Sequence, residues 1–424
     1  MINLSISSLK NKVNKRVKNS SKNDFQDIGG YIKKKRKELN VTQDVVSNGI
    51  CSVSYLSKIE NNQIIPKEFY VKEIMEKLDV DKEFYEKDLN DSLYLNKLLQ
   101  GVFYLDDDLI ESVFKEVEDI KHNLTINICK LVYYVYFNKS DENQYVMMLE
   151  NLVNNMNNFE LKIYLLLASL YYISLDKYKI SLEILILGDK IDITNDYLSA
   201  LYSEYTYLVK QRLLKKNCAS DDYETAQSIY NRFHNVKRSI ILALWKAYYI
   251  SIENPDKALA LLEKIKISLL DDFSKDLYYI IKARALFKIE CNNESIVSLN
   301  NIRETSPFYY QKTILLYEIC LIDKDEEMCG SIKDLLNNFK PDKFQLKYKV
   351  YYHYLLEQQK DSVKEYLRNI AIPYSIKIDD YYGLENYTNE IMNICIENSR
   401  YKEAVQYYKK WQKEKNRITQ ILFD

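Results

Sequence analysis

Apolar residues recur at helical spacing along nearly the whole chain. Between residues 67 and 78, positions 69, 71, 74, 75 and 78 are apolar, a spacing that places them on one face of a helix. From about residue 101 onward, one such helix follows another across short polar turns. The 424 residues include only 7 Gly and 5 Pro, so residues that interrupt helices are scarce. The pattern predicts an all-α fold.

The helices after residue 101 recur at a period that is typical of a repeat array. Each unit reads as a helix, a short polar turn and a second helix with a small residue early in it. The small-residue positions are Ser181, Ala226, Ala258, Ser295, Cys329, Val363 and Ala404. Their intervals of 45, 32, 37, 34, 34 and 41 residues scatter around the tetratricopeptide (TPR) period of about 34. Pro307 and Pro341 fall twelve residues after two of these positions, where a proline ends one helix before the next begins.

A helical hairpin of this kind cannot bury its own apolar face, so successive hairpins stack. Residues 106–424 are therefore predicted to form a TPR-like right-handed superhelix, with a groove lined by the first helix of each hairpin. Before residue 160 the pattern is helical without a defined repeat register. Residues 91–105 are predicted as a linker helix, and residues 1–24, which are polar and basic, as a flexible arm.

A different pattern begins near Ile28. Ile28, Ile32 and Leu39 lie at helical spacing in a basic helix. Thr42 can cap a second helix, which breaks at Gly49, and a third short helix follows that break. Two short helices joined by a tight turn have the form of a helix-turn-helix.

The polar residues of this segment resemble those of a known domain. The matching residues are Thr42-Gln43, then Ser54-x-Leu56-Ser57-Lys58-Ile59-Glu60-Asn61, then Pro66. This signature resembles the Xre-type (phage repressor and Cro-like) DNA-binding domain over residues 25–90, and it implies a domain of five helices. The chain carries Val46-Ser47 where many members carry Leu-Ala, a change that a helical core tolerates. A plain helical hairpin inside a larger bundle would leave the polar signature without a packing reason.

Basic residues are concentrated ahead of residue 40. The formal net charge of the whole chain is −1, which is not that of a protein binding nucleic acid over its entire surface. The basic residues of the N-terminal part are Lys10, Lys12, Lys15, Arg16, Lys18, Lys22 and a cluster at residues 33–37. This asymmetry predicts a basic patch on the N-terminal domain, where phosphate contacts would be made.

Resemblance to the Xre-type domain implies which side chains meet DNA. The residues that would meet base edges, at the exposed start of the third helix, are Val53, Ser54, Tyr55 and Lys58. Gln43 would contact a phosphate or stack on a base-reading side chain. The contacts to the DNA backbone and the electrostatic support would come from Asn61, Asn62, Lys33, Lys34 and Lys37. Tyr55 has an alternative role in packing, and Leu56 and Ile59 are predicted to lie in the core.

In the repeats, the TPR register predicts which side chains face the groove. These are Gln211, Arg212, Arg284, Gln311, Glu318, Tyr352, Asn386, Asn389 and Asn393. The three Asn residues form one stripe at i, i+3 and i+7. Asn amides can hold the backbone of an extended peptide because each offers both a donor and an acceptor. The stripe is equally consistent with a plain solvated helix face.

Enzyme signatures do not occur in the sequence: it has no phosphate-binding glycine loop, no GxSxG and no metal-spaced ligand set. The three His, at 122, 234 and 353, lie far apart, and the seven Cys are dispersed. We therefore expect a non-enzyme with no catalytic residue, no metal and no cofactor. Dispersed Cys fit a reducing cytosol, and no signal peptide or bilayer-length apolar run is evident, so the sequence predicts a cytoplasmic protein without a membrane partner.

The combination of an Xre-type domain with a TPR array resembles the RRNPP family, and residues 49–66 are similar to its PlcR- and NprR-like branch. The resemblance implies a cytoplasmic quorum-sensing transcription regulator that binds double-stranded promoter DNA as a homodimer. A short signalling peptide bound in the TPR groove would control it. Two alternatives stay open: a Rap-like adaptor whose TPR domain sequesters a partner protein, and a ligand-independent dimeric repressor.

Overall fold

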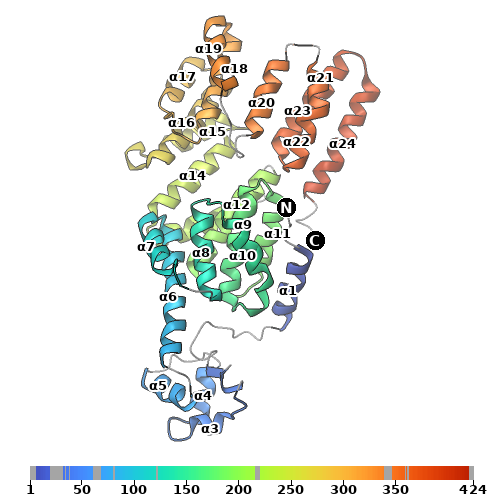
Figure 1. The fold of residues 1–424 in the computed structure, drawn as a ribbon. Helices are drawn as coiled ribbons and strands as arrows, with labels where there is room; N and C mark the ends of the chain where they lie inside the picture. The colour runs from blue at the N-terminus through green and yellow to red at the C-terminus, as the bar shows by residue number, and fades with distance from the viewer. Residues whose placement is uncertain are drawn as a thin grey trace. The chain divides into compact units, whose positions relative to one another are not determined.

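The computed structural model describes residues 6–19, 32–33, 35–37, 39–60, 68–79, 82–120, 123–214, 220–338, 346–358, 360 and 362–419. Within these ranges every regular element is a helix, which confirms the all-α fold (Figure 1). The chain divides into two compact units, residues 1–171 with 183–202 and residues 172–182 with 203–424. Among the described helices, none combines the length and apolarity needed to cross a bilayer.

Two short helices, α3 (Gln43–Ser47) and α4 (Val53–Glu60), form the predicted helix-turn-helix. Thr42 caps α3, because its side-chain oxygen accepts a hydrogen bond from the backbone N–H of Val45 at 3.4 Å. The turn between the helices passes through Gly49, whose φ of 82° would strain a residue with a Cβ atom. The sequence signals at both ends of α3 therefore correspond to its actual bounds.

The core of this domain joins α3 and α4 to α5 (Glu68–Lys77) and to the helical residues 32–33 and 35–37. Its buried members are Ile32, Val46, Leu56, Ile59, Val71, Ile74, Met75 and Leu78. Leu56 and Ile59 of α4 thus occupy the core, as predicted. Leu39 does not, because it lies in the turn after the helical residues, and half of its side chain is exposed.

The predicted fifth helix and the predicted linker helix form one continuous element, α6 (Lys82–Tyr104). Leu98, in its second half, is fully buried. The next helix, α7 (Asp107–Val117), begins where the carboxylate of Asp106 accepts the backbone N–H of Leu109 at 3.0 Å. Acidic side chains in a first turn also favour the positive end of the helix dipole.

The N-terminal residues differ from the sequence expectation. Residues 1–24 were expected to form a flexible arm, but α1 (Ile6–Asn19) is a helix. Leu9 and Val13, one helical turn apart, are fully buried, and α1 contacts the 3-10 turn η1 (Val153–Asn155). The apolar stripe formed by Leu9 and Val13 is narrow and lies among polar residues, so the sequence pattern did not reveal it. Its packing partner, η1, is distant in sequence and meets it only in the folded chain.

The remaining helices that begin in the first unit are α8 (Leu124–Tyr136), α9 (Glu142–Asn151), α10 (Asn158–Ser174) and α12 (Asp196–Leu214). In α11 (Tyr178–Asp189), Gly188 packs directly against the ring of Tyr202. A Cβ atom at position 188 would collide with the Tyr202 hydroxyl, which donates to the carbonyl oxygen of Lys162 at 2.7 Å. Glycine is therefore required at this helix crossing.

The second unit continues as a series of helical hairpins. Its helices are α13 (Ser220–Arg232), α14 (Val236–Ile250), α15 (Pro255–Leu262), the 3-10 turn η2 (Ile267–Leu269), α16 (Asp272–Lys288), α17 (Asn292–Asn300), α18 (Tyr309–Asp323), α19 (Glu326–Asn338), α20 (Leu346–Glu357), α21 (Val363–Tyr366), the π-helical turn η4 (Leu367–Ala371), α22 (Ile372–Lys377), α23 (Tyr381–Glu397) and α24 (Tyr401–Thr419). Consecutive helices such as α16 and α17, or α23 and α24, pack against each other.

The small residues used to set the repeat register each lie in the second helix of a hairpin. Those that are buried are Ser181, Ala226, Ala258, Ser295, Val363 and Ala404. At Ser295 the reason for a small side chain is visible, because its hydroxyl donates to the carbonyl oxygen of Ala283 on α16 at 2.9 Å. Cys329 is only partly buried. The predicted repeat register therefore matches the hairpins from α11 to α24.

Many hairpin turns contain a left-handed residue that is not glycine. Those with positive φ at the turns between paired helices are Leu105, Asn138, Asp176, His234, Glu290, Lys324, Asp379 and Ser399. Glycine is the usual residue at this position after a helix, because it has no Cβ atom to clash. These turns adopt the left-handed conformation without glycine, at a cost of about 1 kcal/mol at each turn.

Candidate DNA-binding face and ligand groove

The start of α4 presents an exposed face. Ser54 and Lys58 are exposed, and Val53 is more than a third exposed. Tyr55 is half-buried and packs on Tyr70 with ring centroids 5.0 Å apart, which favours its alternative role in the core. Lys37 is exposed and Lys33 is half-buried. The other predicted DNA contacts, Lys34, Asn61 and Asn62, lie outside the described residues.

A buried carboxylate at the end of α4 ties this domain together. Glu60, with a fully buried side chain, accepts from Arg36 Nε at 2.6 Å and from Arg36 Nη2 at 2.9 Å. Arg36 Nη1 also donates to the carbonyl oxygen of Val41 at 2.8 Å. The hydrogen bond and charge of Glu60 raise the pKa of Arg36. This bidentate ion pair fixes α4 relative to the segment before α3.

Gln43 takes part in the same network. Its Nε2 donates to Glu60 Oε2 at 2.8 Å, so the amide predicted to reach a phosphate already holds an intramolecular partner. Sequence reasoning missed Arg36 and Glu60 as a pair. One signal was available: Glu60 comes four residues after Leu56, and this spacing places a charged residue on the buried face of α4.

A groove of about 500 Å³ runs along the second unit, lined by side chains of α12, α14, α16, α18, α20 and α23. These are the first helices of successive hairpins. Of the nine residues predicted to face it, the groove brings together Arg212, Arg284, Gln311, Glu318, Asn386, Asn389 and Asn393. Their role in binding stays a prediction, but their convergence in space is a structural fact.

Tyr352 is wrong as a groove residue. Its side chain is 2% exposed, packs on Tyr317 and lies 3.2 Å from Asn337 Oδ1 through its hydroxyl. Helix α20 instead presents Tyr351 to the groove, one residue and roughly 100° around the helix away. Gln211, beside Arg212, likewise does not line the groove.

Arg212 is the most unusual polar group of the groove. Its side chain is 11% exposed, and its closest carboxylate, Asp380, is 3.9 Å from Nη2. Tyr178 lies with its ring 5.3 Å from the guanidinium carbon. Within the part of the chain that the structure describes, neither Nε nor Nη2 of Arg212 has a hydrogen-bond acceptor. The guanidinium therefore has an unsatisfied edge.

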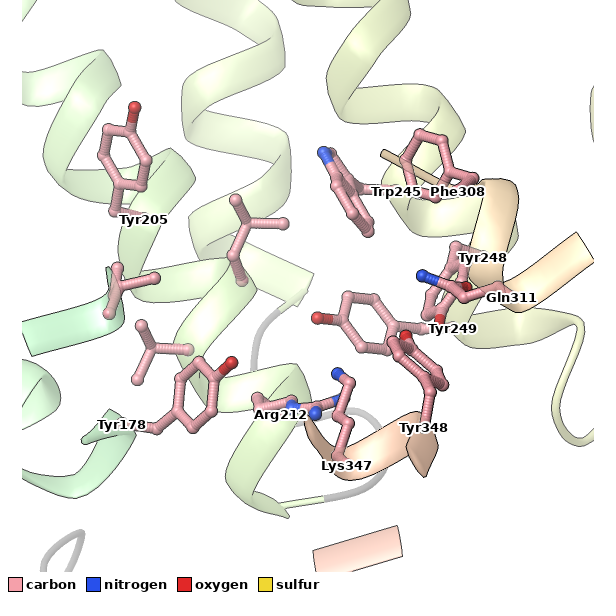
Figure 2. Close-up of a pocket in the computed structure, with 13 residues that line it drawn as sticks. Tyr178, Tyr205, Arg212, Trp245, Tyr248, Tyr249, Phe308, Gln311, Lys347 and Tyr348 are labelled. Atoms are coloured by element: carbon pink, nitrogen blue, oxygen red, sulfur yellow. The ribbon is translucent and has the colours of Figure 1, made fainter. Parts of the chain in front are cut away.

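Lys347 adds a second cation at the same place. Both residues line the groove and the smaller pocket drawn in Figure 2. Burial and the positive charge of Arg212 lower the pKa of Lys347 to about 8, against the opposing effects of Tyr248 and Asp380. This end of the groove thus brings two basic side chains together, and the carboxylates of Asp380 and Asp176 both act on Lys347.

Elsewhere in the groove the charges are compensated. Tyr351 donates to Glu318 Oε1 at 2.5 Å, and burial raises the pKa of Glu318 although Lys288 and Arg284 oppose the shift. Arg284 places its guanidinium 4.6 Å from the ring of Tyr248. On α23 the three Asn of the predicted stripe are aligned along the groove.

A smaller pocket of about 200 Å³ opens beside Arg212 and Lys347 (Figure 2). Its other walls are mainly aromatic and aliphatic, formed by Ile173, Tyr178, Tyr205, Leu208, Val209, Trp245 and Phe308. Sequence reasoning did not find this pocket, because its walls come from helices whose separation in sequence carries no signal of their contact.

Together these features define a class of protein: a helix-turn-helix domain followed by TPR-type hairpins that enclose a polar and aromatic groove. Residues 32–85 match the family described as Helix-turn-helix, HTH_3. A search of curated protein sequences gives no match.

Several solved structures have a similar fold. A Rap protein complexed with competence and sporulation factor superposes with a TM-score of 0.65 at 10% identity, covering 78% of this chain and 99% of that chain. NprR in complex with its cognate peptide NprX gives 0.64 at 14%, covering 75% and 98%. The apo form of NprR from B. thuringiensis gives 0.58 at 15%, covering 78% and 99%. Identities this low establish a shared fold.

Both parts of the predicted architecture, a helix-turn-helix domain and a TPR-like helical array, are therefore confirmed. The N-terminal domain matches the helix-turn-helix family, and the chain has the fold of Rap and NprR.

Proposed function

We propose that this protein is a cytoplasmic, homodimeric DNA-binding regulator controlled by a short extended peptide in the groove of its second unit. The observation that carries the proposal is the convergence of predicted polar residues from first helices of successive hairpins into one groove. A groove of about 500 Å³ is within the range of specific ligand sites. Rap and NprR have each been solved with a bound factor or peptide, which supports the same class of ligand.

A peptide fits the groove better than a compact metabolite does. Asn386, Asn389 and Asn393 extend along α23, where their amides can pair with successive peptide groups of an extended chain. Tyrosines that line the groove, among them Tyr351 and Tyr382, give rigid contact area for side chains. No catalytic role is proposed for any groove residue.

The DNA half of the proposal rests on α4. Its exposed start carries Ser54 and Lys58, which can donate to base edges in a major groove. The network of Arg36, Gln43 and Glu60 holds this helix in place. In a homodimer, two such helices would read two half-sites of an operator.

Control by a peptide requires linkage. The peptide changes DNA affinity only if it binds one conformer of the protein better than another. Such a coupling is reciprocal, so operator DNA must change peptide affinity by the same factor.

The test uses the purified full-length chain, its own promoter fragment and synthetic peptides from the C-terminal segment of a small secreted peptide encoded beside the gene. Calorimetry should give saturable one-to-one binding that weakens at least tenfold in Asn389→Ala/Asn393→Ala. Peptide should also shift promoter affinity in fluorescence anisotropy. Promoter binding that no peptide alters would overturn the proposal in favour of a ligand-independent repressor. Capture of a partner protein that peptide releases, without promoter binding, would favour a Rap-like adaptor.

A further inference from the structure

The edge of the Arg212 guanidinium that has no acceptor can be compared with the same edge of Arg36, which is paired. Arg36 uses Nε and Nη2 to hold both oxygens of Glu60, at 2.6 and 2.9 Å. Arg212 leaves the same two atoms without an acceptor among the described residues. The N–H groups of Nε and Nη2 lie in the guanidinium plane along one edge, a geometry that matches the two oxygens of a carboxylate.

The surroundings of Arg212 do not supply that carboxylate. Asp380 is 3.9 Å from Nη2, too far for a hydrogen bond, and it is the only acid placed within ion-pair distance in the described residues. Lys347 contributes a second positive charge, and the other groups that act on the guanidinium are the phenols of Tyr178, Tyr249 and Tyr348. A buried cation is costly unless it is paired, so this end of the groove favours an anion from outside.

The adjoining pocket adds a second requirement. Trp245, Tyr205 and Phe308 give it aromatic walls, and it opens beside both cations (Figure 2). Its volume is about 200 Å³. An apolar cavity of about 150 Å³ is large enough to hold a benzene ring. One aromatic or large aliphatic side chain would therefore fill this pocket.

We propose that the ligand of the groove presents a carboxylate to the Nε–Nη2 edge of Arg212 and inserts a neighbouring aromatic or large aliphatic side chain between Tyr178 and Trp245. This inference rests on the proposed function and specifies the chemistry of its peptide. The carboxylate is either the free C-terminus of the peptide or the side chain of an Asp or Glu next to the apolar residue. Both sources satisfy the same guanidinium edge.

Trp245 provides a direct readout of the pocket. The chain contains 2 Trp, so a Trp411→Phe background leaves Trp245 as the single indole. The probe is N-acetyl-phenylalanine, which joins a carboxylate to an aromatic ring. It should change the emission of Trp245 saturably, and N-acetyl-phenylalanine amide or N-acetyl-alanine should bind at least tenfold more weakly. N-acetyl-aspartyl-phenylalanine amide then tests the side-chain carboxylate as the source.

Substitutions of Arg212 test whether its guanidinium binds the carboxylate. Arg212→Gln should lose binding of N-acetyl-phenylalanine, and Arg212→Lys should keep only part of it because an ammonium lacks the planar edge. Lys257→Gln, which removes a charge from the exposed surface of α15, should bind as the parent does. Circular dichroism and thermal unfolding check that each variant is folded, and Arg212→Gln should be no less stable than the parent.

The outcomes separate this inference from the proposed function. If short peptides bind the parent and Arg212→Gln equally, with or without a carboxylate, the peptide groove stands and the carboxylate site is refuted. If inorganic phosphate competes with N-acetyl-phenylalanine as strongly as acetate does, the edge is a general anion site and the peptide chemistry is refuted. If no peptide binds while N-acetyl-phenylalanine does, the site stands and the peptide proposal fails.

Discussion

Glu60→Gln is the sharpest test of the DNA-binding domain. The side chain of Glu60 is fully buried and accepts hydrogen bonds from Arg36 Nε, Arg36 Nη2 and Gln43 Nε2 at 2.6 to 2.9 Å. An amide at this position removes the negative charge and one of the two acceptor oxygens. The guanidinium of Arg36, whose side chain is 13% exposed, would then be left largely buried and unpaired.

Breaking one partner of a buried ion pair costs about 3–5 kcal/mol. Arg36 keeps some contact with water and its bond to the carbonyl oxygen of Val41, which places the expected cost near the lower limit, about 3 kcal/mol. At about 1.4 kcal/mol for each factor of ten, the equilibrium for opening this domain should shift by roughly 100-fold.

Because the full-length chain has two compact units, a single unfolding midpoint would mix their stabilities. Hydrogen exchange of the amides in α3 and α4 measures the relevant unit directly, since exchange through opening accelerates in proportion to the opening equilibrium. The amides of α16 and α17, in the second unit, serve as the internal reference and should exchange as in the parent.

A double variant separates the ion pair from general packing. Arg36→Met/Glu60→Leu replaces both charges by apolar side chains of similar length, and it should cost less than Glu60→Gln because no charge is left unpaired. The reasoning is refuted if Glu60→Gln exchanges at the parent rate. It is equally refuted if the double variant is as unstable as the single one.

Three further predictions concern other parts of the chain. Ser54→Ala/Lys58→Ala should weaken promoter binding in anisotropy by at least tenfold, and unchanged affinity would remove α4 from the role of recognition helix. Lys324→Gly, at a φ of 57°, should raise the stability of the second unit by about 0.5–1 kcal/mol in denaturant, whereas Lys324→Ala should not. Lys347, with a pKa of about 8, should gain a proton when a carboxylate binds beside it, because the anion raises that pKa. Affinity for N-acetyl-phenylalanine should therefore fall as pH rises from 7 to 9, and calorimetry in buffers of different ionisation enthalpy should detect proton uptake that Lys347→Met lacks.

Helical period in the sequence was enough to predict the face on which many side chains lie. Ser295 and Ala258 sit at the buried crossings of their hairpins because a fixed interval along the chain places them there. The same interval brought Arg284 and Asn389 to the groove. The interval fails at α20, where seven residues before the helix lie outside the described part, and Tyr351 rather than Tyr352 faces inward. A one-residue slip turns a side chain by roughly 100°, so register errors move a prediction from the groove to the core.

The sequence pattern did not reveal which residues far apart in the chain contact each other. Arg36 and Glu60 are 24 positions apart, and nothing in their neighbourhoods marks one as the partner of the other. The pocket beside Arg212 depends on Tyr178, Trp245 and Lys347, which three different helices contribute. Period can place each residue on a face, but only the packing of those faces decides which residues meet.

The contrast between three arginines supports the proposal that the groove binds a carboxylate ligand. Arg36 is paired with Glu60, and Arg238, 3% exposed, is paired with the buried Glu204 at 2.6 Å. In both cases folding supplies the carboxylate that burial of the cation demands. Arg212 is also largely buried, yet the carboxylate paired with it among the described residues, that of Asp380, has its Oδ1 3.9 Å from Nη2. A ligand that supplies the missing carboxylate would satisfy the guanidinium without first breaking a protein ion pair. Its binding should therefore stabilise the second unit against unfolding by RT ln(1 + [L]/Kd), where [L] is the free ligand concentration, and Arg212→Gln should remove that stabilisation while leaving the unliganded protein folded.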